Sequence, residues 1–64
     1  MIIVPRSKLT DTYMLLLDDV TIFFDYFEIG DNSTNTVHLY KNSHQVALVR
    51  FDKGAEFMRM MGSL

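Results

Sequence analysis

The stretch from Val20 to Gly30, VTIFFDYFEIG, constrains the fold of this chain more than any other feature. It places large apolar side chains at both odd and even positions, with Asp25 and Glu28 set among them. A strand with this pattern has two apolar faces, because successive side chains point to opposite sides of a sheet. A chain of 64 residues buries only about 60% of the surface of its unfolded chain, so covering both faces is difficult. We therefore expect part of this apolar surface to meet another chain.

Two periodicities compete over the first half of the chain. A heptad pattern runs through Leu9, Tyr13, Leu16, Val20, Phe23 and Phe27 and allows one long helix over residues 8–29. Residues 20–29 are, however, mostly β-branched or aromatic, and such side chains favour a strand. The sequence thus predicts a strand over 20–29, preceded by a short helix over 8–17 that Ser7 can cap. The long helix stays open as the alternative.

The second half of the chain predicts a β-hairpin. Residues 36–41 and 45–51 are rich in β-branched and aromatic side chains, and turn-forming residues separate them. With Asn42 and Ser43 in the turn, Lys41 pairs with His44, and further pairs are Leu39 with Val46 and Val37 with Leu48. Together with the strand at 20–29, this hairpin gives a three-stranded antiparallel meander.

A short helix is predicted to end the chain over residues 54–61. Asp52 is in a position to cap it, Gly62 to stop it, and Phe57 leads an apolar stripe that suits a core-facing side. Residues 30–35, GDNSTN, form the only dense cluster of turn-forming residues and predict a loop. The expected fold class is therefore α+β, in one small domain over residues 1–64.

Charge is distributed unevenly along the sequence. Residues 9–40 contain six acids and no Lys or Arg, namely Asp11, Asp18, Asp19, Asp25, Glu28 and Asp31. All six cations lie in the two flanks, and the net charge of the chain is −2. The acidic block is either an ordinary solvated surface or a patch that faces a basic partner.

Catalytic, cofactor and metal sites are not expected. His38 and His44 fall on opposite faces of the predicted hairpin, so His38 is interpreted as a packing residue and His44 as an exposed turn residue. Glycine-rich phosphate-binding motifs are absent from the sequence, and a chain this short builds no deep substrate cleft. Cysteine is absent, and the sequence shows neither a signal peptide nor a membrane span, so a cytoplasmic protein is expected.

These observations favour a non-catalytic protein-interaction module. Aromatic anchors surrounded by charge are typical of interfaces, and the candidate partner-binding residues are Asp18, Asp19, Phe23, Asp25, Phe27 and Glu28. The expected partners are a second copy of the chain and a basic protein surface. Small acidic inhibitors of nucleic-acid-handling enzymes or regulators, of the kind that phages and mobile elements encode, work in this way.

Two alternatives remain open at the level of the sequence. The first is a small nucleic-acid-binding regulator whose contacts would be Lys41, Arg50, Lys53 and Arg59. The second is a structural subunit of a larger assembly.

Overall fold

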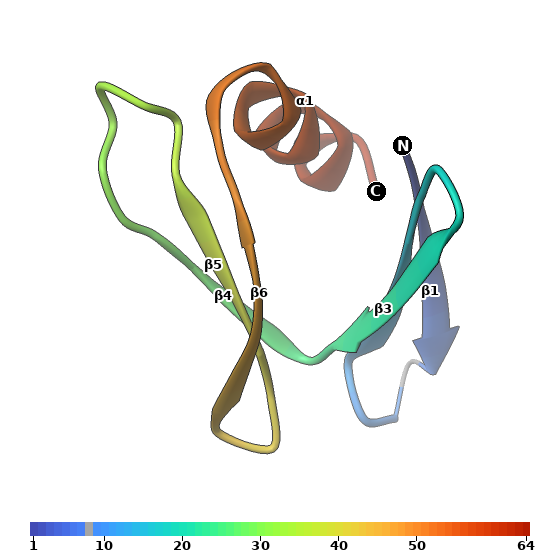
Figure 1. The fold of residues 1–64 in the computed structure, drawn as a ribbon. Coiled ribbons are helices and arrows are strands. Elements are labelled where there is room, and N and C mark those ends of the chain that lie inside the picture. Colours follow the sequence, from blue (N-terminus) through green and yellow to red (C-terminus); the bar gives the residue numbers. More distant parts are fainter. Residues whose placement is uncertain (8) are drawn as a thin grey trace.

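The computed structural model describes residues 1–7 and 9–64. Over these residues the chain forms six strands and one helix: β1 (Ile2–Ser7), β2 (Thr12–Leu17), β3 (Val20–Phe24), β4 (Tyr26–Ile29), β5 (Val37–Lys41), β6 (His44–Val49) and α1 (Phe51–Gly62). Strands β1, β2 and β3 form an antiparallel N-terminal sheet, and β4, β5 and β6 form an antiparallel C-terminal sheet. The two sheets diverge from the corner between β3 and β4, and α1 lies between their open ends (Figure 1). The expected α+β class is confirmed.

The N-terminal helix expected over residues 8–17 is wrong, and so is the long helix over 8–29. Residue 8 lies outside the described residues, and Thr12–Leu17 is strand β2. The helical interpretation required Leu9 to share a buried face, but this side chain is 98% exposed. The physical reason is that β1 pairs along β2. Strand β1 supplies Ile2, Ile3 and Val4, whose branched side chains suit a sheet.

The strand expected over residues 20–29 is confirmed as extended chain, but it breaks at Asp25 into β3 and β4, which belong to different sheets. At the break Asp25 N–H donates to Tyr40 O at 2.9 Å, while its carboxylate Oδ2 accepts a hydrogen bond from Asn42 N–H at 3.0 Å. The predicted meander is therefore the C-terminal sheet, to which only the second half of the long strand contributes. This break explains why apolar residues occur at both odd and even positions, since β3 and β4 belong to different sheets.

The β5–β6 hairpin turns at Asn42 and Ser43 as expected, and Lys41 pairs with His44. Both turn residues have positive φ values, 53° and 67°, as a tight hairpin turn requires. A bulge then shifts the register, so Leu39 pairs with Ala47 and Val37 pairs with Val49. The expected partners Val46 and Leu48 are wrong for this reason, and both side chains are exposed on the outer side of the sheet.

The C-terminal helix is confirmed, but α1 begins at Phe51 rather than at residue 54, and Arg50 rather than Asp52 occupies the N-cap position. Phe51 N–H donates to Thr34 O at 2.6 Å, which ties the start of the helix to the β4–β5 loop. Asp52 lies instead in the first turn, where a negative charge interacts favourably with the helix dipole.

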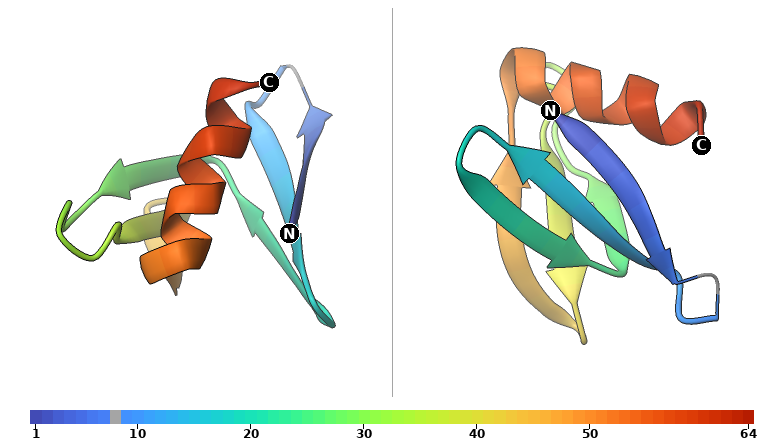
Figure 2. Two further views of the ribbon diagram at one scale, coloured as in Figure 1. Left: turned by 90° about the horizontal axis from the view of Figure 1, so that it is seen from above. Right: turned by 90° about the vertical axis from the view of Figure 1, so that its right-hand side faces the viewer.

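One hydrophobic core joins both sheets and the helix. Phe57 of α1 is fully buried, and its ring centroid lies 5.6 Å from that of Phe24 and 5.3 Å from that of Phe27. Other fully buried side chains come from each sheet, including Leu15 and Leu39. The sheets therefore bury their inner faces against each other and against α1, as two further views show (Figure 2). Their outer faces lie on the surface, so each sheet is covered once rather than twice.

Candidate functional site

The outer face of the C-terminal sheet carries a pair of tyrosines. Tyr26 of β4 pairs with Tyr40 of β5 across the ladder, so both rings stand on the same face. Their centroids are 5.7 Å apart at an angle of 43°, and the Tyr26 side chain is 55% exposed. The two rings therefore form a continuous aromatic surface that solvent or a ligand can reach.

Glu28 lies beside this surface because it is two residues from Tyr26 on the same strand, and thus on the same face. The Tyr26 hydroxyl donates a hydrogen bond to Glu28 Oε1 at 3.1 Å. This hydrogen bond and the negative charge of Glu28 raise the pKa of Tyr26 above its ordinary value. The pair holds a carboxylate in a fixed place next to an aromatic ring.

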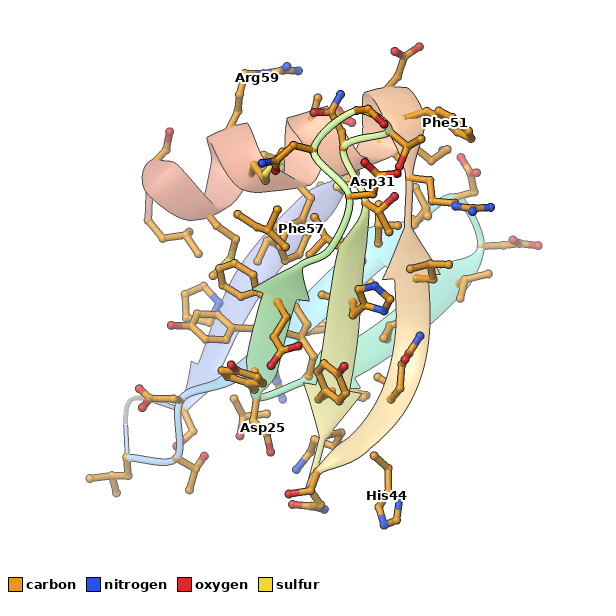
Figure 3. The ribbon with its side chains drawn as sticks, turned by 90° about the vertical axis from the view of Figure 1, so that its left-hand side faces the viewer. Asp25, Asp31, His44, Phe51, Phe57 and Arg59 are labelled. Atoms are coloured by element: carbon orange, nitrogen blue, oxygen red, sulfur yellow. The ribbon has the colours of Figure 1, made fainter. Side chains whose placement is uncertain are left out.

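Asp25 adds a second carboxylate at the end of the sheet away from α1 (Figure 3). Its hydrogen bond with Asn42 N–H fixes its position, and Lys41 Nζ lies 4.0 Å from its Oδ2 atom. The six residues Asp25, Tyr26, Glu28, Tyr40, Asn42 and Ser43 line an open hollow of about 380 Å³. We refer to this hollow as the acidic tyrosine pocket.

The chemistry of the acidic tyrosine pocket suits a cation. Aromatic faces attract Lys or Arg groups through the ring quadrupole, and carboxylates accept charge-assisted hydrogen bonds from them. Tyr26 and Glu28 come from β4 and Tyr40 comes from the neighbouring strand β5, while Asp25 directly precedes β4.

The structure divides the six predicted partner-binding residues among several places. Asp25 and Glu28 lie in the acidic tyrosine pocket. Phe27, next to them in sequence, points inward and packs edge-on against Phe57. Asp18 and Asp19 occupy the β2–β3 turn, at the opposite end of β3 from the pocket, where Asp18 Oδ2 lies 3.8 Å from Lys53 Nζ. Phe23 is 46% exposed on the outer face of the N-terminal sheet.

The candidate residues drawn from the sequence leave out both tyrosines of the site. Tyr26 lies within the acidic aromatic stretch, but the candidates from that stretch include only Phe23 and Phe27 among its aromatic residues. Tyr40 lies in a different segment and joins the site only through the pairing of β4 with β5. The signal that could have found it is the parity of the hairpin, which places Tyr40 and His38 on one face.

The four candidate nucleic-acid contacts do not form one basic surface. Lys41 lies near Asp25, and Lys53 lies near Asp18, so carboxylates offset both charges. Arg50 stacks over the Phe51 ring at 5.8 Å, near the start of α1. Arg59 extends from the side of α1 that faces away from the sheets (Figure 3). This dispersal does not favour binding to a phosphate backbone, which requires several cations along one track.

The two histidines lie where they were expected, with His38 half-buried on β5 and His44 exposed at the hairpin tip (Figure 3). Within residues 1–7 and 9–64, His, Asp and Glu side chains form no group of three or more that could hold a metal ion. Among the described residues, no helix has the length and apolar character that crossing a membrane requires.

Comparisons with protein-family models, with curated proteins and with solved structures find no match to this chain.

Proposed function

We propose that the protein is a non-catalytic interaction module that binds a basic surface of a partner protein through the acidic tyrosine pocket. The observation that carries this proposal is the meeting of Glu28 with the rings of Tyr26 and Tyr40 around one hollow, at whose edge lies Asp25, a carboxylate that Lys41 offsets only in part at 4.0 Å. Such a site combines aromatic contact area with charge that steers and orients a cationic partner. A basic groove of a nucleic-acid-handling enzyme or regulator is a partner of this kind, and occupying it would make the protein an inhibitor.

The binding of a cation to the pocket can be tested with short capped peptides. We expect an arginine-containing peptide to shift the amide NMR signals of Tyr26, Glu28, Tyr40 and Asn42, and a matched glutamate-containing peptide to leave them in place. Raising the salt concentration should weaken binding, because the site is exposed to solvent. Shifts that spread evenly over the acidic block would contradict the proposal.

Matched variants separate the pocket from general acidity. Glu28→Gln removes the charge of the pocket carboxylate and should raise the dissociation constant about tenfold, the scale of one charge-assisted hydrogen bond. Asp11→Asn makes the same charge change in the exposed β1–β2 turn and should leave the dissociation constant within about twofold. Equal losses in both variants would mean that net charge, rather than the pocket, attracts the peptide.

The proposal includes self-association, for which the outer face of the N-terminal sheet is the candidate surface. Cross-strand rows place Val4, Met14 and Phe23 together there, next to a row of Ile2, Leu16 and Thr21. These positions carry no charge, so no like charges face each other across this contact. Sedimentation at micromolar concentration should show a dimer that Phe23→Glu removes and Leu48→Glu retains; the two side chains are similarly exposed on different sheets. A monomer at all concentrations would remove this part of the proposal.

A further inference from the structure

Strand β4 forms one edge of the C-terminal sheet, with β5 as its neighbour in the strand order of the described residues. Gly30 N–H donates to Thr36 O at 2.8 Å, which sets the alternation of hydrogen-bonded pairs along the β4–β5 ladder. By this alternation the backbone N–H and C=O groups of Tyr26 and Glu28 point toward β5. Those of Phe27 and Ile29 point toward the open edge. Strand β4 therefore offers backbone donors and acceptors to an added strand.

A hollow lies along the inner side of this edge. It has a volume of about 320 Å³ and is lined by Phe27, Ile29, Met58, Met61 and Gly62. We call this hollow the methionine groove. Methionine side chains are flexible and polarizable, and they adapt to apolar ligands of different shape.

The opposite side of the same edge is the acidic tyrosine pocket. Tyr26 and Glu28 stand on the outer face of β4, while Phe27 packs inward against Phe57. Successive side chains of an added strand would alternate between these two environments. One set would enter the methionine groove, and the other would lie across from Tyr26 and Glu28.

We infer that the partner binds as an extended segment in which apolar and basic residues alternate, and that this segment pairs with β4. Its apolar side chains occupy the methionine groove, and its basic side chains lie beside Glu28. The inference rests on the proposed function and specifies the form in which the basic partner presents its charge. Strand addition of this kind draws affinity from main-chain hydrogen bonds and specificity from alternate side-chain positions.

Charge complementarity favours such a segment over a second copy of β4 itself. A second β4 would bring another Glu28 to a side that already holds a carboxylate, whereas Lys or Arg in the added strand meets it favourably. Like charges directly opposite each other in a sheet are destabilising, and opposite charges are stabilising.

A pair of peptides with the same composition tests the inference. In one, valine alternates with lysine; in the other, the valines and lysines form two blocks. We expect the alternating peptide to bind at least about tenfold more tightly, because only it satisfies both sides of the strand at once. It should also slow hydrogen exchange at the amides of Phe27 and Ile29, which a side-chain contact alone would leave unprotected. N-methylation of the peptide at alternate residues should abolish this protection.

Matched variants identify the groove. Ile29 is 51% exposed and lines the groove on β4, whereas Leu48 is 44% exposed on β6. Ile29→Ser should weaken the alternating peptide at least about fivefold, and Leu48→Ser should leave it unchanged. Equal binding of both peptides without amide protection would overturn strand addition while leaving the proposed function standing. Failure of every basic peptide would overturn both, and protection at these amides caused by concentrating the free protein would assign the edge to a second copy and overturn the inference.

Discussion

Gly54 in the first turn of α1 lies against the carbonyl oxygen of Asn35, so closely that a Cβ atom at residue 54 would come within 1.6 Å of this oxygen. The helix and the β4–β5 loop therefore meet backbone to backbone. This contact works with the hydrogen bond from Phe51 N–H to Thr34 O to hold the start of α1 on the C-terminal sheet. Glycine is required here by the close approach and not by its dihedral angles, since its φ is not positive.

Gly54→Ala should therefore destabilise the protein by about 2 kcal/mol or more, because backbone must move to admit a methyl group. Gly62, in the same helix, is the matched control, since nothing lies within 4 Å of a Cβ placed there. Gly62→Ala should change the free energy of unfolding by less than about 1 kcal/mol, and in the stabilising direction. Urea unfolding measures both values. Equal effects of the two substitutions would contradict the close approach of α1 to the loop.

Phe57 joins the two sheets, because its ring contacts Phe24 of the N-terminal sheet and Phe27 of the C-terminal sheet. Phe57→Ala should lower the free energy of unfolding by about 3–5 kcal/mol, the range for truncating a buried phenylalanine. Because the core is shared, amide protection should fall in both sheets together. Phe51→Ala, at an exposed position of the same helix, should cost less than about 1 kcal/mol. Loss of protection in one sheet alone would show that the sheets fold independently.

Local signals in the sequence were sufficient to predict the hairpin and the helix of the second half of the fold, though not the register of the hairpin or the start of the helix. The turn at Asn42 and Ser43 and the stop of the helix near Gly62 depend on residues close to one another in the chain. The N-terminal half depends on pairing between strands, which the sequence of a single segment does not indicate. The sequence of β2 alone predicts a weak helix, whereas in the fold β2 is a strand that pairs with β1. The bulge that exchanges Val46 for Ala47 opposite Leu39 likewise has no local signal, since both residues are compatible with a strand.

For the same reason, the sequence predicted only part of the candidate site. Asp25 and Glu28 were found because acids among aromatic residues stand out along the chain. Whether each neighbouring ring faces the core or solvent depends on where the long strand breaks, and this break at Asp25 relies on a contact with Asn42, 17 positions further along. Parity alone places Tyr26 and Phe27 on opposite faces of the strand, but it does not tell that Phe27 packs inward and Tyr26 faces outward.

The hydrogen bond from the Tyr26 hydroxyl to Glu28 predicts a change in phenol titration. The carboxylate stabilises the protonated phenol and opposes the negative charge of the phenolate, so the pKa of Tyr26 is raised. Glu28→Gln should lower that pKa toward its ordinary value. An absorbance titration of the tyrosines measures this as ionisation at a lower pH than in the unchanged protein, and Tyr26→Phe identifies the affected group. An unchanged titration curve in Glu28→Gln would contradict the placement of Glu28 beside this ring.

The loop between β4 and β5 is organised around the side chain and backbone of Asp31. Its Oδ1 atom accepts hydrogen bonds from Ser33 N–H at 2.9 Å and from the Ser33 hydroxyl at 2.8 Å. Its backbone oxygen accepts further bonds from Thr34 N–H and Thr36 N–H. These contacts shape the loop that packs against the start of α1, so a change at Asp31 should reach the helix.

The two hydrogen bonds from Ser33 lower the pKa of Asp31 below its ordinary value. Its contribution to stability is therefore complete above the pKa of the unfolded state and is lost as the pH falls through the lower pKa of the folded state. Asp31→Asn keeps the shape and one acceptor but cannot ionise, so it should be less stable than the unchanged protein near neutral pH, with the difference shrinking in acid. Thermal unfolding across the acidic range measures this difference. Ser33→Ala keeps the carboxyl group but removes one donor, so its deficit should be smaller and should shrink in the same direction. A deficit in Asp31→Asn that stays constant with pH would mean that the loop needs the oxygen of residue 31 but not its charge.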